Sequence, residues 1–519
     1  MREDWIEVEL QEVFETVTGN TPSKKEIDNY GEDIPFIKPP DITNSAINSI
    51  SEYLSNKGKQ KARVLPSNSV LITCIGNLGR VGFNKDEVAF NQQINAILPT
   101  DFIDFKFTFY QAQSGNFRNQ LESLSTSTTV ALVNKSSFNS VKIEIAPLPI
   151  QRAIVSKIEA LFSDLDNGIA NFKKAQEQLK IYRQAVLKKA FEGELTKEWR
   201  EKQNNLPTAE ELLKQIKEER QNHYNQQIED WKKAVKEWEK NGKVGKKPNK
   251  PQSLKVVTAL SDEELENLCD LPKGWFWNKF GNVCLKIMDG THFSPKNIDK
   301  GEYKYITAKN IKEGKIDLSN ITYVSKDDHK SIYARCDVKK GDVLYIKDGA
   351  TTGKAAVNNL NEEFSLLSSV GVFRVSEKVI LPKYLEYFLN AEVNKNRMLE
   401  NVAGVAITRL TLIKLNHSYF SLCSLPEQTQ IVQEIESRLS VCDKMEQSIS
   451  ESLEKAEALR QSILKKAFEG KLLSEAEIEQ CKQAADYEPA SELLKKIRAE
   501  KLAKEQEKKK STTKKKSKK

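Results

Sequence analysis

The amino-acid sequence predicts an α+β protein in which two β-rich α+β domains alternate with two long helices that pair as an antiparallel coiled coil. Two observations support this prediction: an internal repeat that covers most of the chain, and a coiled-coil spacing of apolar residues in each repeated helical segment. The duplication implies a pseudo-twofold internal repeat. At 519 residues the chain is also too long for one core, so several domains are expected.

The clearest part of the repeat is a pair of long helical segments. Residues 148–196 and 425–473 align without a gap at an offset of 277, with 20 of 49 positions identical, and both contain the sequence LKKAFEG. A charged segment follows each of them, because residues 209–220 and 490–501 share seven of 12 positions. The chain therefore contains one unit twice: a globular block, a long helix and a charged helical extension.

Apolar residues recur at intervals of three and four along both long segments, which is typical of a coiled coil. Such a stripe needs a partner helix, and the other copy is the obvious candidate. We predict that the stripe pairs the helices or binds a partner through Ile158, Leu161, Leu165, Ile169, Phe172, Leu179, Ile435, Leu439, Met445, Ile449, Leu453 and Leu459. About 40 helical residues at roughly 1.5 Å each would make a rod of roughly 60 Å.

The repeat and the changes in composition divide the chain into six predicted parts. They are a first domain (1–147), a central long helix (148–198), a charged helical connector and linker (199–258), a second domain (259–424), a distal long helix (425–473), and a helical extension with a Lys-rich disordered tail (474–519).

The two globular blocks share a skeleton although their sequences have diverged. Each contains an apolar strand closed by a glycine loop, VLITCIGNLGR at 70–80 and VLYIKDGATTGK at 343–354. Each also has an earlier Gly/Thr/Pro turn, at 18–22 and at 289–295. Many short strands and turns with few helices indicate β-rich α+β domains.

The net charge of +8 is located almost entirely at the C-terminus. Residues 508–519 hold eight lysines and no acidic residue, so the rest of the chain is close to neutral. Such a tail is either a solvated end or a salt-sensitive contact to phosphate. The globular part must therefore show any nucleic-acid binding through its architecture.

The remaining composition narrows the class of protein. None of the seven cysteines lies at CxxC spacing and the four histidines are scattered, so we predict reduced thiols and no metal site. No apolar run reaches the roughly 18–20 residues of a membrane span, and the first residues lack a secretory signal. We expect a cytoplasmic protein.

At this point the order of segments resembles the specificity subunit of type I restriction–modification enzymes. The resemblance is carried by the LPxxQ helix openings (148–151 and 425–428), the LKKAFEG endings and the DGTH-to-Pro turn (289–295), and it covers essentially residues 1–473. It implies two target-recognition domains that read two short sequences in double-stranded DNA across an unspecific gap. It also implies that the helices bind two methyltransferase subunits, which methylate adenine, and that restriction (motor–nuclease) subunits join the full complex.

The same resemblance implies that this chain binds no cofactor, whereas its partners use S-adenosylmethionine, ATP and Mg²⁺. The sequence agrees with a non-catalytic chain. Its only Pro-Pro, Pro39-Pro40, has Lys38 before it and Asp41 after it, so the loop with which adenine methyltransferases hold a flipped base is missing. The segment nearest to an ATP-binding loop, 349–354, has one residue too few between its glycines.

Two other interpretations stay open. The connector could carry an unrecognised nuclease activity, which cleavage of DNA by the purified chain with Mg²⁺ would reveal. The chain could also be a purely structural coiled-coil scaffold, which predicts no sequence preference in DNA binding but leaves the duplicated globular block unexplained.

Residues that contact DNA are nominated by their chemistry and by their place in loops. Arg and Lys suit guanine, Asn and Gln suit adenine, and Ser and Thr are permissive. The nominees from the first block are Lys38, Asn77, Arg80, Gln92 and Gln93. Those from the second block are Lys309, Asn310, Lys347, Thr351, Thr352 and Lys354.

Overall fold

The computed structural model describes residues 4–126, 130–253, 256–400 and 409–516. It divides into two compact units, residues 1–174 with 449–519 and residues 175–448. Each unit holds one globular domain, which we call domain 1 (within 1–147) and domain 2 (within 259–424), together with one half of each long helix. Among the described residues, no helix combines the length and the apolar character needed to cross a membrane.

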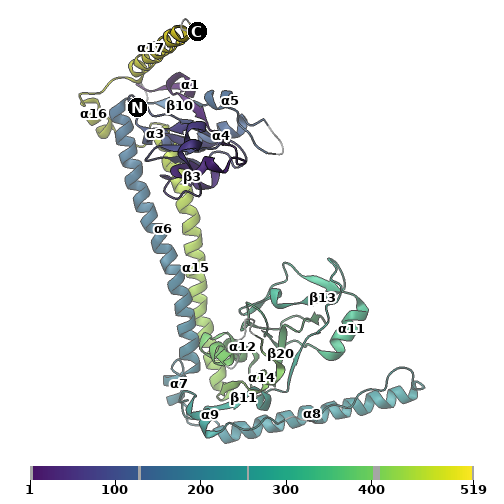
Figure 1. The fold of residues 1–519 in the computed structure, drawn as a ribbon. Coiled ribbons are helices and arrows are strands. Elements are labelled where there is room, and N and C mark those ends of the chain that lie inside the picture. Colours follow the sequence, from purple (N-terminus) through teal and green to yellow (C-terminus); the bar gives the residue numbers. More distant parts are fainter. Residues whose placement is uncertain (1–3, 127–129, 254–255, 401–408, 517–519) are drawn as a thin grey trace. The chain divides into compact units, whose positions relative to one another are not determined.

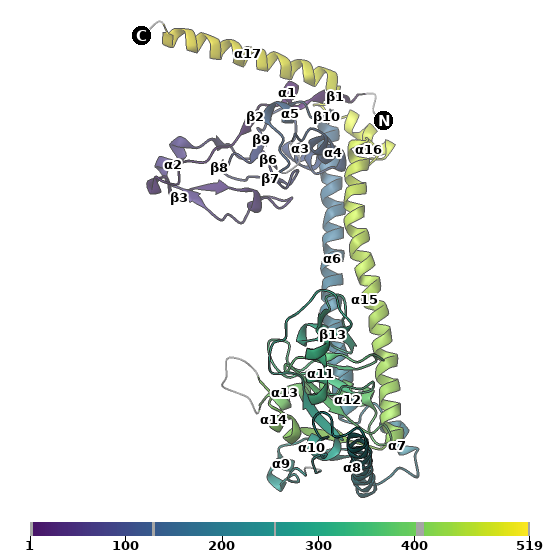
Figure 2. The ribbon, with the colours of Figure 1, turned by 90° about the vertical axis from the view of Figure 1, so that its right-hand side faces the viewer.

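Domain 1 is built on two four-stranded sheets (Figure 2). The first sheet is antiparallel, in the order β2-β9-β6-β7, with β2 (Thr16–Thr18), β9 (Ile94–Ile97), β6 (Val70–Thr73) and β7 (Val81–Phe83). The second, β4-β3-β8-β5, consists of β4 (Tyr53–Leu54), β3 (Tyr30–Ile37), β8 (Val88–Phe90) and β5 (Val64–Leu65), and β3 and β8 are parallel. A ribbon of β1 (Ile6–Glu9) and β10 (Lys142–Ile145) leads into the first long helix. Every residue of β6 and β9 is buried, which explains why these strands are mostly apolar rather than alternating.

Domain 2 repeats this topology. Its four-stranded sheet has the order β12-β20-β17-β18, with β12 (Lys286–Asp289), β20 (Val370–Arg374), β17 (Val343–Ile346) and β18 (Ala355–Val357). The smaller sheet is β16 (Thr322–Val324), β13 (Tyr303–Ile306) and β19 (Ser365–Leu366), and here too the last two strands are parallel. The closing ribbon is β11 (Phe276–Lys279) with β21 (Tyr419–Leu422), and a hairpin of β14 (Ile311–Lys312) and β15 (Lys315–Ile316) is an addition. The predicted pair of α+β domains is confirmed.

The helices of the two domains also correspond. Domain 1 contains α1 (Leu10–Val13), α2 (Asn56–Lys61), α3 (Phe105–Ala112), α4 (Gly115–Ser123), α5 (Lys135–Asn139) and the 3₁₀ turn η2 (Pro39–Asp41). Domain 2 contains α9 (Asp262–Glu266), α10 (Phe280–Val283), α11 (Lys326–Arg335), α12 (Pro382–Asn390), α13 (Glu392–Glu400), α14 (Leu412–His417) and the 3₁₀ turn η3 (Ala308–Asn310). The aromatic-rich α3 and α12 occupy the positions that the sequence predicts, after the main sheet, and their aromatic rings enter the two cores.

The two long helices, α6 (Leu148–Phe191) and α15 (Leu425–Phe468), pair antiparallel in each unit (Figure 1). The buried residues of α15 follow a repeat of seven: Ile435, Cys442, Ile449, Ala456 and Ile463 are each at most 8% exposed. Along this part of α15 the seam therefore covers one position per heptad fully and flanking positions such as Leu439 and Leu453 only in part.

Two members of the predicted stripe are not covered by this narrow seam, so of the two predicted roles they suit partner binding rather than helix pairing. Met445 is 50% exposed and Leu459 is 49% exposed, so the pairing of the helices leaves both side chains largely in solvent. They lie at the edge of the seam, where the facing helix does not reach. The other ten predicted positions are buried or half-buried.

The glutamine of each LPxxQ opening explains why that motif occurs twice. Gln151 donates to Ala146 O at 2.7 Å and accepts from Asp104 N–H at 2.9 Å. Gln428 donates to Cys423 O at 2.9 Å and accepts from Leu381 N–H at 2.9 Å. Both side chains are fully buried, and in each copy they tie the last strand of a domain to the start of its aromatic-rich helix.

The charged extensions dock on the domains in equivalent ways. After the short α7 (Lys197–Glu201), the connector helix α8 (Ala209–Lys240) places Arg220 against α10, where its guanidinium donates to Gly281 O and Asn282 O at 2.9 Å. After α16 (Glu475–Lys482), α17 (Ala490–Lys516) places Lys501 against α1, where its ammonium donates to Gln11 O at 2.7 Å.

The predicted helical extension at the C-terminus is present, and the disorder of its Lys-rich end stays a prediction. Helix α17 continues through the Lys-rich segment as far as Lys516. The reason is local: residues 490–516 contain neither Pro nor Gly, and Lys is a good helix former.

Candidate nucleic-acid interface

Three loops meet at one edge of the main sheet of domain 1. They follow the end of β2, follow the end of β6, and precede the start of β9. Backbone hydrogen bonds join them: Cys74 N–H donates to Gln93 O at 2.9 Å, and Gly19 N–H donates to Ile94 O at 3.1 Å. We call this edge rim 1, defined as residues 18–20, 74–80 and 91–93.

Domain 2 has the same edge. Lys347 N–H donates to Ser369 O at 2.9 Å, and Gly290 N–H donates to Val370 O at 3.4 Å, which joins the loops after β12 and β17 to the start of β20. We call this edge rim 2, defined as residues 289–292, 347–354 and 367–369. The predicted correspondence of the two glycine loops, and of the two earlier turns, is therefore real in space.

A close backbone approach in each rim explains why the turn after β2 and the turn after β12 both contain glycine. A Cβ on Gly19 would lie 2.1 Å from Asn91 O, and one on Gly290 would lie 2.1 Å from Leu366 O. No other residue fits there without moving the backbone, which is a use of glycine independent of its freedom in φ.

Charged side chains form a row of linked ion pairs across rim 2. Lys347 Nζ lies 3.1 Å from Asp348 Oδ2 and 3.5 Å from Asp289 Oδ2, and the Lys347 and Asp289 side chains are only 2% and 3% exposed. Arg335 Nη2 donates to Asp289 Oδ1 at 2.9 Å, and Arg409 Nε lies 3.8 Å from Asp348 Oδ1. The two arginines at the ends are 50% and 61% exposed. This row of ion pairs contains three cations and two carboxylates. Its net charge is therefore positive, and the exposed guanidiniums of Arg335 and Arg409 present that charge to solvent.

The buried side chains at the corresponding positions of rim 1 are uncharged, and its charge comes only from exposed arginines. Thr18 Oγ1 donates to Asn95 Oδ1 at 2.6 Å, and Asn95 and Cys74 are each 2% exposed. Burial raises the pKa of the Cys74 thiol to about 12, so the thiol stays protonated. The guanidinium of Arg63, which is exposed, donates to Thr18 O.

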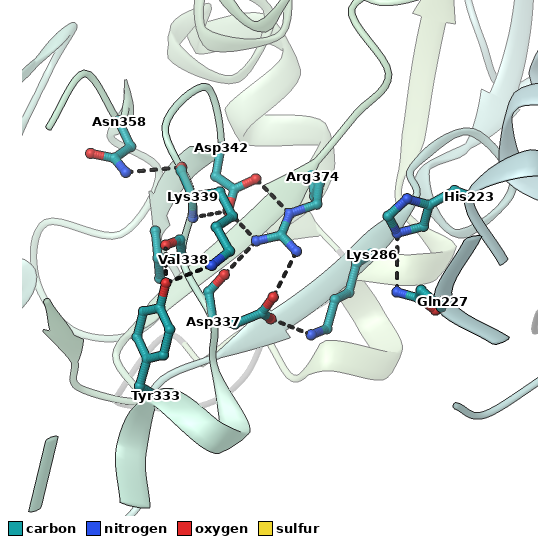
Figure 3. Close-up of polar contacts among 10 residues, drawn as sticks. All are labelled: His223, Gln227, Lys286, Tyr333, Asp337, Val338, Lys339, Asp342, Asn358 and Arg374. Carbon is teal, nitrogen blue, oxygen red and sulfur yellow. Dashed lines mark hydrogen bonds and ion pairs between the residues drawn. The ribbon is translucent and has the colours of Figure 1, made fainter. Parts of the chain in front are cut away.

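The far end of β12 is anchored by a second ion-pair cluster (Figure 3). Arg374 binds Asp337 and Asp342 through its guanidinium at 3.0 and 2.8 Å, and Lys286 also pairs with Asp337. Burial acts to raise the pKa of Asp337, but Lys286 and Arg374 outweigh it and lower that pKa. His223 of α8 faces this cluster, and its pKa is lowered by burial and by Arg374 and Lys286. The connector helix therefore lies beside the ion-pair cluster at the start of β12.

Comparison with protein families gives a direct match to this architecture. The model of the type I restriction modification DNA specificity domain matches residues 2–174 and 272–455. The chain belongs to this family. It is a DNA specificity subunit of the type I restriction–modification class, as the sequence motifs indicate.

Curated relatives match this chain over nearly its whole length. The EcoBI specificity subunit of Escherichia coli is 23% identical over 505 residues, which cover 97% of this chain and 94% of the relative. The EcoKI specificity subunit of Escherichia coli strain K12 is also 23% identical, with 96% of each chain covered. A solved structure from a study of complex assembly and conformational transition of the type I system shares the fold, with a TM-score of 0.60, 18% identity, and coverage of 90% of this chain and 98% of that one.

Most of the nominated DNA-contacting residues lie at or beside the rims. Asn77, Arg80 and Gln92 are exposed in rim 1, Gln93 is half-buried there, and Thr351 is exposed and Lys354 half-buried in rim 2. Lys38 and Lys309 follow the strands β3 and β13 in the two smaller sheets. Lys309 is exposed, whereas Lys38 is half-buried in an ion pair with Glu52 at 2.7 Å. Their contacts with DNA stay predictions.

Three nominees of domain 2 have buried side chains that bond within the fold. Asn310 is 4% exposed and bonds to Thr307 and Asp317 in the turn η3. Lys347 is buried between two carboxylates, and Thr352 is 5% exposed with its hydroxyl donating to Gly349 O at 2.6 Å. Contacts of these three side chains with DNA stay predictions, and their burial argues against them.

The structure adds three residues that the sequence did not nominate. Arg63 and Arg335 reach the rims from segments distant in sequence, and His292 Nε2 lies 3.4 Å from Asp289 Oδ2. The available signal was the DGTH turn, whose buried Asp289 needs cationic partners. The sequence could not tell which cations of the chain would meet it.

Proposed function

We propose that this specificity subunit reads a bipartite, asymmetric DNA target, with one half-site for each domain. The supporting observation is the pair of rims: the same three loops are joined by equivalent backbone hydrogen bonds in both domains, yet the side chains that line them differ in charge. Two readers of the same topology and different chemistry suit two half-sites of different sequence.

We further propose that the subunit directs adenine methylation, and restriction, by partner subunits. Exposed apolar residues on the long helices, such as Ile181 (70% exposed), Val441 (56%) and Met445, suit the docking of two methyltransferase subunits. Restriction subunits complete the complex. In this proposal the chain works in the cytoplasm, binds no cofactor and catalyses no reaction, and S-adenosylmethionine, ATP and Mg²⁺ serve the partners.

The test is a genome-wide map of adenine methylation in a host that expresses this chain with its methyltransferase subunit, compared with the methyltransferase subunit alone. A new bipartite motif that depends on this chain is the expected result. If the complex assembles and no new motif is methylated, the proposal fails. Incubation of the purified chain with DNA and Mg²⁺ is a second check, since cleavage without partners would contradict a non-catalytic role.

The spacing of the half-sites has its own test. Inserting one helical turn into only one of the two long helices is expected to change the length of the unspecific gap and to leave both half-sites unchanged. An altered half-site with the same gap would count against the helices as spacers.

A further inference from the structure

We propose that Arg63 and Arg335 are equivalent specificity residues, each reading a guanine in the half-site of its own domain. This inference rests on the proposed function and deepens it, because it assigns a residue and a base to each half-site. Neither arginine belongs to a glycine loop, and each reaches its rim through the tertiary fold.

The two arginines come from equivalent elements. Helix α2 and helix α11 each follow the edge strand of the smaller sheet, and each begins after a serine cap, Ser55 and Ser325, whose hydroxyl accepts a backbone N–H at 3.1 Å. Arg335 is the last residue of α11, and Arg63 lies two residues beyond the end of α2.

Both guanidiniums end on the same structural position, the residue directly before the tightly packed rim glycine. Arg63 donates to the backbone carbonyl of Thr18, which precedes Gly19. Arg335 donates to the side chain of Asp289, which precedes Gly290. The helices differ in length, six residues against ten, so an ungapped alignment from the two serine caps does not pair these arginines. The tertiary fold brings both to one point of the shared topology.

This attachment favours base reading over simple attraction to phosphate. A guanidinium is planar and carries five N–H donors, so a hydrogen bond to a fixed acceptor orients the fork and leaves donors for a second acceptor. Guanine offers the O6 and N7 acceptors that such a fork matches in the major groove. A flexible lysine would be sufficient for a phosphate contact.

The acceptor in rim 2 is itself held in place. Asp289 is 4% exposed, and the buried ammonium of Lys347 lies 3.5 Å from its second oxygen. The charge of the carboxylate is thereby compensated inside the domain, while Arg335 stays half exposed beside it. Arg335 is in this way positioned at an exposed surface by a buried partner.

The experiment is the methylation map repeated with the full complex for the wild type and for Arg335→Ala, Arg63→Ala, Arg335→Lys and Arg63→Lys. Each alanine variant is expected to relax discrimination at one guanine by about 10-fold or more, and only in the half-site of its own domain. Lysine keeps the charge and loses the fork, so the lysine variants are expected to relax the same positions. Lys330→Ala, an exposed cation on α11, is the matched control and should leave both half-sites unchanged.

The outcomes separate this inference from the proposed function. A wild-type complex without a bipartite motif defeats the proposed function itself. A normal wild-type motif overturns the arginine inference alone if a half-site lacks guanine, or if the lysine variants keep full discrimination. A uniform loss of methylation across all target sequences, with the half-sites unrelaxed, also overturns it and indicates a phosphate contact. Assembly of each variant with its methyltransferase subunits is measured first, and the lysine variants decide the question where an alanine variant does not assemble.

Discussion

Rim 1 and rim 2 have the same backbone arrangement but are lined by different side chains. Lys347 in rim 2 and Cys74 in rim 1 follow equivalent strands and make the same backbone bond to the loop before the next strand. In domain 2 that position holds a buried ammonium between Asp289 and Asp348, whereas in domain 1 it holds a buried, neutral thiol beside Asn95. The same topology forms with a buried ammonium or with a buried thiol at this position, because the backbone hydrogen bonds that form the edge do not depend on these side chains.

The comparison shows where the freedom of this fold lies. Positions that tie strands together are equivalent in both copies, such as Gly19 and Gly290, or Gln151 and Gln428. Side chains that line the edge have diverged. Reading two different half-sites on one scaffold, as proposed for this subunit, needs this separation between supporting and reading positions.

The largest difference in stability between the two domains is expected when Lys347 and its counterpart Cys74 are each replaced by alanine. Lys347→Ala leaves Asp289 and Asp348 without their shared buried cation and should destabilise domain 2 by about 3 kcal/mol or more. Cys74→Ala at the equivalent position removes only a buried sulfur and should cost about 1 kcal/mol. Hydrogen exchange of β17 and β6 in the full chain measures both, and equal losses of protection would contradict the contrast between the rims.

A smaller effect of similar size is expected at the position that the copies share. Gln151→Ala leaves a buried N–H and a buried carbonyl without their partner, and Gln428→Ala leaves a second carbonyl, Val379 O, as well, so each should cost about 2–3 kcal/mol in its own unit. Urea unfolding of the full chain, resolved by hydrogen exchange at α3 and α12, reports the two losses. Gln430→Ala, a half-buried residue on the same helix as Gln428, is the control and should change little. A loss in only one unit would show that the glutamines are not equivalent.

The smallest effect concerns an ion pair that anchors α16 to α6. A hydrogen bond from Lys157, with help from Ser474, lowers the pKa of Glu477 to about 2. Because this pKa lies below that of the unfolded chain, the stabilisation is present above about pH 4.5 and is lost as the pH falls toward about 2. The thermal midpoint of Glu477→Gln should therefore lie slightly below that of the wild type near pH 7 and converge with it at low pH. Glu479→Gln on the same helix is the control, and a gap that persists at low pH would refute the assignment.

Much of the fold could be predicted because the chain repeats itself. The LPxxQ and LKKAFEG motifs begin and end both long helices, and the heptad spacing predicts that the helices pair. Spacing at threes and fours could not tell which positions of the stripe the facing helix covers and which, such as Met445 and Leu459, it leaves exposed for a partner.

The candidate site was predicted only in outline. The glycine loops were correctly matched between the copies, since an apolar strand followed by glycine is a local pattern. Residue type alone could not separate an exposed reader from a buried support, so Asn310, Lys347 and Thr352 were nominated for DNA although their side chains bond within the fold.

By itself, the sequence determined the duplication, the helices and the family, because these depend on local patterns and on motifs that occur twice. The rims depend on contacts between residues far apart in the chain: Arg335 lies 46 residues from Asp289, and Arg63 lies 45 residues from Thr18. Only a folded sheet, whose strands are not neighbours in sequence, brings each arginine to the carbonyl or carboxylate that holds it. Helix and strand patterns are short-range properties, whereas the pairing of a charge with its partner is decided by the tertiary structure.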